Sequence, residues 1–178
     1  MTTTPQGRQS ALQREIRQTR PFRSTRQEAL LGLLKTSDVL RRFLATLAEP
    51  HGITLQQYNV LRILRGAGPE GLPTLEIAER LIEQAPGVTR LLDRLEGKGL
   101  VKRQRCPLDR RQVTCRITPR GLKQLARMDG SMDAADDRGL GMLPDRDVER
   151  LVEILDVVRA GHGPAPARSE TKTRDKER

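Results

Sequence analysis

Two arginines four residues apart, Arg90 and Arg94, are the side chains whose chemistry is easiest to interpret. Leu91, Leu92 and Leu95 mark the opposite, apolar face of a predicted helix. A guanidinium group presents paired N–H donors that match the acceptors of guanine, and an α-helix fits the DNA major groove. The spacing therefore favours a helix that contacts base edges or phosphates.

A basic hairpin is predicted immediately after this helix. Residues 100–106 and 113–118 have the composition of two short strands, and residues 107–112 form the connection between them. An arginine at the tip of such a loop suits a narrow minor groove, and Arg111 or Arg110 would be that arginine. A helix-turn-helix followed by a basic hairpin is typical of a winged helix-turn-helix.

The charge of the chain is concentrated in this region. The chain of 178 residues has a formal net charge of +10. Residues 84–120 carry ten basic and three acidic residues, a net +7, whereas residues 121–160 carry six and nine, a net −3. This asymmetry is expected when one part of a protein contacts a polyanion and another does not.

The remaining elements are mostly helical. Leucine is abundant, and the chain has one Tyr, two Phe and no Trp, which disfavours an extensive sheet. Thr54 and Gln57 have the spacing of a capping box, Thr74 is a candidate helix cap, and Thr118-Pro119 is another helix start. The predicted helices cover residues 27–49, 54–65, 74–81, 86–98, 119–138 and 144–160.

The run Thr74–Gly121 resembles the MarR family of transcriptional regulators. The motifs that carry the resemblance are VTRLLDRLEGKGLV at residues 88–101, Asp109-Arg110-Arg111, and Ile117-Thr118. It implies a mainly α fold with a small β-wing: a winged helix-turn-helix lobe at about 54–118 and dimerisation helices at about 27–49 and 119–160. It also implies a homodimer that binds a palindromic operator in double-stranded DNA, more commonly as a repressor. Separately, no apolar run in the sequence is long enough for a transmembrane helix or a signal peptide, so a cytoplasmic protein without a membrane partner is expected.

The resemblance and the charge pattern together define the candidate site. In many relatives the recognition helix starts with Ser or Thr, but Glu83-Gln84-Ala85-Pro86-Gly87 stands here, so operator sequences do not transfer. The wing aspartate, Asp109, is expected to pair with Arg94 or Arg90 and to buttress the recognition helix. The predicted DNA-binding residues are Gln84, Pro86, Gly87, Thr89, Arg90, Arg94, Lys98, Arg103, Arg105, Asp109, Arg110 and Arg111.

The dimer surface and an effector site are further expectations. Relatives often bind small amphipathic ligands between the dimer helices and the lobe, which makes a small-molecule effector a possible partner and places its cleft between the first, second and fifth helices. The predicted dimer surface combines the first helix with apolar residues near the C-terminus. Those residues are Leu122, Leu125, Met142, Leu143, Val148, Leu151, Leu155 and Val158.

Other function classes fit the sequence less well. It shows no Ser/His/Asp or Cys/His set, metal cluster or phosphate-binding glycine loop, so neither an enzyme nor a cofactor is expected. An RNA-associated or architectural winged helix would use the same basic face, although few aromatic residues are available for base stacking. A module that binds an acidic protein is a third alternative.

The termini and the two cysteines complete the expectations. Residues 1–26 and 161–178 are predicted to be flexible tails, and the arginines of the first could also form a DNA-contacting arm. Cys106 and Cys115 both lie in the hairpin and are candidates for a redox pair, although the sequence favours two small strand residues without a redox role. If residue 106 faced residue 113, Cys115 would face Gln104 and the two thiols would not be directly opposite.

Overall fold

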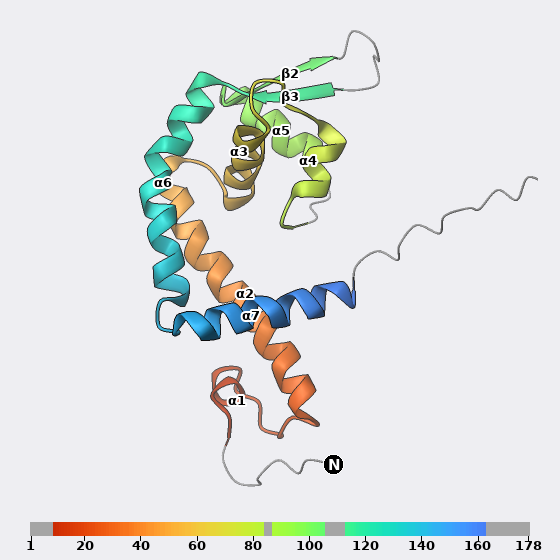
Figure 1. Cartoon of the computed structure of the whole chain (residues 1–178), viewed down its shortest axis with the longest axis vertical. Helices are drawn as coiled ribbons and strands as arrows, with labels where there is room; N and C mark the ends of the chain where they lie inside the picture. Colours follow the sequence, from red (N-terminus) through yellow and green to blue (C-terminus); the bar gives the residue numbers. More distant parts are fainter. Residues whose placement is uncertain (1–8, 84–86, 106–112, 163–178) are drawn as a thin grey trace, which may run out of the picture. The chain divides into compact units, whose positions relative to one another are not determined.

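The structure is a computed structural model that describes residues 9–83, 87–105 and 113–162. It confirms a mainly helical chain with a small antiparallel sheet (Figure 1). Residues 1–136 and 137–178 form two compact units. The helices are α1 (Ala11–Glu15), α2 (Thr25–Ala48), the 3-10 turn η1 (Glu49–His51), α3 (Leu55–Ala67), α4 (Thr74–Arg80), α5 (Val88–Gly97), α6 (Pro119–Leu140) and α7 (Asp145–Ala160).

The hydrophobic core of the first unit lies between α3, α4, α5, the sheet and α6. Leu61, Leu64, Ile77, Leu92 and Leu95 have no exposed surface. Each is an apolar position of its helical repeat, and burial of such a side chain contributes about 1.5–3 kcal/mol. Helices α3, α4 and α5 thereby become one packed lobe.

The start of α3 follows the sequence expectation closely. The Thr54 hydroxyl accepts a hydrogen bond from the backbone amide of Gln57 at 3.2 Å, and the Gln57 side chain accepts one from the Thr54 amide, also at 3.2 Å. This reciprocal pair is the predicted capping box. Ile53 and Tyr58 flank it and are both buried in the core.

The sheet has three strands in the order β1-β3-β2. Strands β2 (Val101–Arg105) and β3 (Val113–Ile117) form the expected hairpin, and β1 (Leu72–Pro73) adds to the other edge of β3. β1 was not predicted from the sequence, because a two-residue strand that contains a proline has no periodicity of its own. β1 exists only as the pairing partner of Thr114 and Cys115 in β3.

Thr74 has a different role from the expected cap. It is the first residue of α4, Pro73 occupies the cap position, and the Thr74 hydroxyl donates to the carbonyl of Val113 at 3.2 Å. The expected cap was therefore wrong: the hydroxyl ties α4 to β3 across the sequence. Thr118, by contrast, accepts a hydrogen bond from the Gly121 amide at 3.0 Å, as its predicted place at a helix start requires.

The N-terminal segment is more structured than predicted. Residues 9–24 were expected to belong to a flexible tail, but α1 forms there with Ser10 as its cap. Gln13 is buried and donates to the carbonyl of Arg20 at 3.1 Å, while Glu15 forms an ion pair with Lys35 of α2 at 3.4 Å. The polar local sequence did not predict this helix, which is stabilised by contacts with α2.

Helix α7 and the residues just before it expose much apolar surface. Leu125, expected at the dimer surface, is instead fully buried in the core, because α6 turns this side of its first turns toward the lobe. No residue of α7 is buried, and Val152, Ile154 and Val157 are about half exposed or more. Met142 and Leu143 are also exposed.

Candidate nucleic-acid interface

The helix α5 presents its polar face as the sequence predicted. Leu91, Leu92 and Leu95 are buried. All residues expected on the outward face are exposed: Gly87, Thr89, Arg90, Asp93, Arg94 and Lys98. The buried leucines fix the depth of the helix in the lobe, so its arginine face is held toward solvent.

Helix α5 begins two residues later than predicted. Its first residue is Val88 rather than Pro86, and Gly87 precedes it at φ +108°, a backbone conformation that L residues rarely adopt. Among the described residues, no side chain caps this end by a hydrogen bond, and none lies within 4 Å of a Cβ added at Gly87. Backbone N–H groups at such an uncapped helix start are donors for a phosphate. Gln84 and Pro86 lie outside the described residues.

Arg103 links the hairpin to α5. Its backbone amide and its Nε donate to the two carboxylate oxygens of Glu96 at 2.9 and 2.8 Å, and Nη2 forms ion pairs with Glu96 and Asp93. Hydrogen bonds from the Arg103 backbone and side chain lower the pKa of Glu96, and the same carboxylate raises the pKa of Arg103. Arg103, predicted to bind DNA, therefore has intramolecular partners that orient it.

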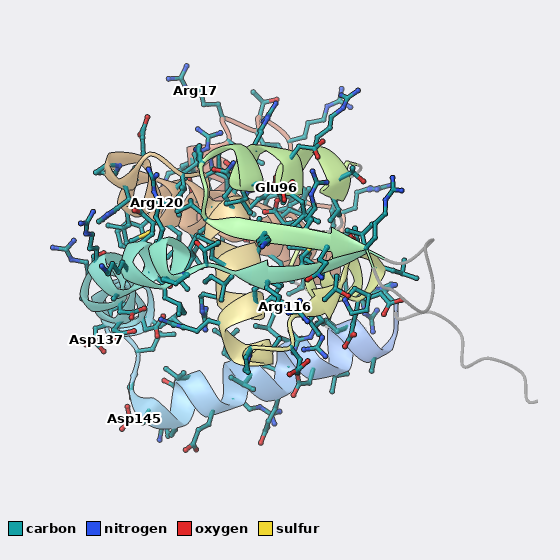
Figure 2. All side chains as sticks on the ribbon, turned by 90° about the horizontal axis from the view of Figure 1, so that it is seen from above. Arg17, Glu96, Arg116, Arg120, Asp137 and Asp145 are labelled. Atoms are coloured by element: carbon teal, nitrogen blue, oxygen red, sulfur yellow. The ribbon has the colours of Figure 1, made fainter. Side chains whose placement is uncertain are left out.

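The two faces of the hairpin differ as strand alternation requires. Val101 and Cys115 are buried on the side of α5, where Glu96 also lies, whereas Arg116 lies on the other side (Figure 2). There Arg116 donates to the Gln104 side chain at 3.0 Å and to the carbonyls of Pro69 and Glu70. Both faces of the hairpin are thus attached to the lobe.

Lys98 is also used within the lobe. Its Nζ donates to the carbonyl of Gly52 at 2.6 Å and to the Gln57 side chain at 3.2 Å. The C-terminal end of α5 is thereby joined to the start of α3. Lys98 was predicted as a DNA-binding residue, and the structure places its ammonium group on these two internal acceptors.

Three predicted arginines remain directed to solvent. Arg90 and Arg94 on α5 and Arg105 at the end of β2 are exposed, and they form no ion pair with any other residue that the structure describes. A guanidinium without a carboxylate partner is available for a phosphate or a base. Asp109, Arg110 and Arg111 lie outside the described residues, as does the expected pairing of Asp109 with Arg94 or Arg90.

The redox expectation for the hairpin cysteines is not supported by the surroundings of Cys115. Cys115 pairs with Arg103 in the sheet rather than with Gln104, because the register is shifted by one residue from the assumed one. Its thiol is fully buried, and burial raises its pKa. A buried neutral thiol is a poor nucleophile. Cys106 lies outside the described residues.

Two acidic residues organise the interface, Asp93 and Glu96, and neither was predicted to do so, although Asp93 was expected on the outward face. Their spacing of three residues on α5 places both on one helical side, and a basic strand follows within ten positions. That combination was a usable signal for an ion pair between helix and hairpin. The described residues contain no group of three or more acidic, His or Cys side chains arranged to hold a metal ion.

Known proteins share this arrangement. Residues 53–113 match the model of the MarR family. A MarR transcription factor from Planctomyces limnophilus is 38% identical, with a TM-score of 0.60 over 77% of this chain and 99% of its own. The chain belongs to the MarR family.

Two further MarR-type relatives agree in sequence and in fold. The HTH-type transcriptional regulator MhqR of Bacillus subtilis is 29% identical over 105 residues, which are 59% of this chain and 71% of that protein. A MarR family regulator of Streptomyces coelicolor, solved in complex with DNA, is 22% identical and has a TM-score of 0.71 over 83% of this chain and 94% of its own. MarR family members are transcription regulators, not enzymes.

The β2–β3 hairpin is therefore the wing of a MarR winged helix, and α5 is its recognition helix. Within the described part of the chain, no helix combines the length and apolar composition that a membrane crossing needs.

Proposed function

We propose that this MarR protein binds a specific palindromic operator in duplex DNA as a homodimer and represses transcription from it. The observation that carries the proposal is the exposed pair Arg90 and Arg94 on a recognition helix whose other face is buried. The helix is held by Lys98 at its end and by Arg103 at its side. Rigid presentation of two guanidinium groups is what base readout in the major groove requires.

Arg105 and the helix N-terminus would supply phosphate contacts in this proposal. A relative that shares the fold was solved in complex with DNA, which supports DNA as the partner. Phosphate contacts fix the register of a protein on the duplex, and base contacts provide the specificity. Gln84, Pro86, Thr89, Asp109, Arg110 and Arg111 belong to the same proposed interface.

Exposed apolar side chains support the homodimer. Leu30 and Leu34 of α2 are each more than half exposed, and so are Val152 and Val157 of α7. Apolar surface that recurs along two helices is the usual sign of a protein interface. Two copies related by two-fold symmetry would present two recognition helices to a palindrome.

A small-molecule effector completes the proposal. Because MarR relatives bind amphipathic ligands between dimer helices and lobe, we infer release from DNA by such a ligand. Its binding would favour a lobe spacing that does not match the operator.

The test begins with selection of duplexes from a random pool by the wild-type protein, together with footprinting on the DNA upstream of its own coding region. The proposal expects an enriched palindrome, and Arg90→Ala should weaken binding to it by about 1–3 kcal/mol for each half-site. Arg146→Ala, which removes an exposed arginine from α7, is the matched control. Binding without sequence preference, or a preference for structured RNA, would overturn the proposal.

A further inference from the structure

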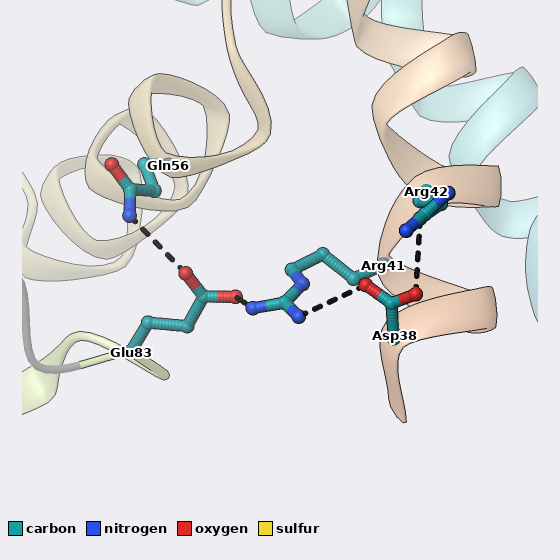
Figure 3. A network of polar contacts seen from close by, with 5 residues as sticks. All are labelled: Asp38, Arg41, Arg42, Gln56 and Glu83. Atoms are coloured by element: carbon teal, nitrogen blue, oxygen red, sulfur yellow. Dashed lines mark hydrogen bonds and ion pairs between the residues drawn. The ribbon is translucent and has the colours of Figure 1, made fainter. Parts of the chain in front are cut away.

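Glu83 connects three separate segments of the chain. One carboxylate oxygen accepts a hydrogen bond from Nη1 of Arg41, on α2, at 3.2 Å (Figure 3). The other accepts one from the side-chain amide of Gln56, on α3, at 3.1 Å. Glu83 precedes Val88, the first residue of α5, by five positions. The carboxylate therefore ties the approach to the recognition helix to two other helices.

Arg41 is itself held from the opposite side. Its Nη2 donates to Asp38 at 3.4 Å, and the second oxygen of Asp38 accepts from Nε of Arg42 at 3.0 Å. Although partial desolvation opposes it, the contacts with Arg42 and then Arg41 lower the pKa of Asp38. A residue of the same helix, Asp38, thus orients the Arg41 guanidinium that donates to Glu83.

The contacts of Glu83 with Arg41 and Gln56, called here the tie, fix the orientation of the segment that follows α4. Apolar packing at this point does not fix that orientation. Leu81 is buried and anchors the end of α4 in the core, whereas the next residue, Ile82, is 83% exposed. Apolar burial is non-directional, so it resists withdrawal of the segment more than rotation of it. Two hydrogen bonds on one carboxylate fix an orientation. Glu83 is therefore the directional restraint between the two helices of the helix-turn-helix.

The network is electrically balanced. Arg41 and Arg42 face Asp38 and Glu83, so two positive charges meet two negative ones. Its removal as a unit would leave the long-range attraction of the lobe for a polyanion unchanged. An effect on DNA binding would then have to come from geometry.

We propose that Glu83 is a positioning residue for operator specificity: through Arg41 and Gln56 it sets the direction in which the recognition helix leaves the turn. This inference rests on the proposed function. Since base readout depends on helix orientation more than phosphate attraction does, loss of the tie lowers the affinity for the operator more than the affinity for unrelated DNA.

The experiment is a double-mutant cycle on the full-length protein. Glu83→Gln, Arg41→Gln and the double variant are titrated against the selected palindrome and against a scrambled duplex of the same length. Each single variant should lower the ratio of the two affinities about two- to fivefold, and the double variant should lower it no further. Arg41→Lys, which keeps the charge, should recover part of the ratio.

Glu153→Gln is the matched control, because it makes the same carboxylate-to-amide change in an exposed ion pair, that of Glu153 with Arg150 within α7. It should leave the ratio unchanged. Thermal unfolding of every variant is measured in parallel, and the tie is exposed enough that midpoints should stay close to wild type.

The outcomes separate this inference from the proposed function. If the wild-type protein shows no preference for any duplex, the proposed function fails and the positioning role with it. If the wild type discriminates but the ratio is unchanged in Glu83→Gln, or if the two single losses simply add, the positioning role alone is overturned. A ratio that falls only in step with the unfolding midpoint overturns it as well.

Discussion

Arg103 and Glu96 meet at two points, because the backbone amide and the guanidinium of Arg103 both donate to the carboxylate of Glu96. A side chain of the recognition helix thus replaces a backbone partner at the edge strand β2. These contacts join the described strands of the wing to the recognition helix. In the proposed complex, major-groove and minor-groove contacts would therefore move together.

The first prediction concerns this contact. Glu96→Gln should lower the free energy of unfolding at pH 7 by about 1 kcal/mol, a modest loss because the carboxylate is partly exposed. Urea unfolding measures the change. Asp93→Asn is the comparison, since its more exposed carboxylate meets only the guanidinium. An equal or larger loss in Asp93→Asn would contradict the importance of the backbone contact.

The same contact predicts a pH dependence. The folded pKa of Glu96 is lowered from its ordinary value of 4.5, so the unfolded chain binds this proton more readily than the folded one. The stabilisation is then fully present above pH 4.5 and is lost as pH falls through the lower folded pKa. The difference in unfolding free energy between wild type and Glu96→Gln should be constant from pH 6 to 7 and should shrink below pH 4.5. A difference that grows on acidification would contradict this sign.

A second prediction concerns Gly71, at φ +70° beside β3. A Cβ built there lies 2.2 Å from the carbonyl oxygen of Cys115, so Gly71→Ala combines backbone strain with a clash against backbone. It should destabilise the protein by about 2 kcal/mol or more. Gly130→Ala, in the middle of α6 with nothing within 4 Å, should instead stabilise it by about 0.5–1 kcal/mol. Thermal unfolding of both variants tests this prediction. Similar unfolding midpoints for the two variants would contradict the steric argument.

The sequence predicted those features of the fold that depend on short-range patterns. The Thr54–Gln57 capping box and the buried leucines of α5 depend on spacing within one helix, and both were predicted. The strand β1 and the hydroxyl contact of Thr74 depend on β3, about forty residues away, and both were missed.

The candidate site divides in the same way. Exposure of Arg90 and Arg94 follows from helical periodicity and was predicted. The partners of Lys98 and Arg103 are decided by tertiary packing, which a basic residue count does not contain. Their basic character and their places on the helix face and the hairpin predicted contacts with DNA, whereas the fold gives them carboxylate, amide and carbonyl acceptors.

A third prediction concerns Cys115. Its burial and raised pKa oppose formation of the thiolate, so the native thiol should react very slowly with an aromatic disulfide reagent at pH 8. The measurement uses Cys106→Ser, in which Cys115 is the only thiol. Full reactivity is expected to appear only in denaturant. Rapid labelling of the folded variant would restore the redox hypothesis for this residue.

A fourth prediction concerns Arg105. As an exposed residue at the end of β2, it should contact phosphate rather than a base in the proposed complex. Arg105→Ala should therefore weaken binding to the palindrome and to scrambled DNA alike. Because each protomer of the proposed dimer loses one phosphate contact, it should reduce the slope of log affinity against log salt by about two. Arg146→Ala should leave that slope unchanged. Loss confined to the palindrome would show that Arg105 reads sequence.

The last prediction decides between two roles of the N-terminal arginines. Glu15 pairs with Lys35, and an added Cβ at Gly32 would lie 3.7 Å from Leu12, so α1 packs on α2. Deletion of residues 1–23 retains the Ser24 cap of α2, which accepts from the amide of Gln27 at 3.2 Å. Because the deletion removes this packing but no residue of the winged helix, it should lower the free energy of unfolding by about 1–2 kcal/mol and leave operator affinity unchanged. Deletion of residues 1–8 is the control and should change neither quantity. Weakened DNA binding at unchanged stability would instead identify the arginines as a DNA-contacting arm.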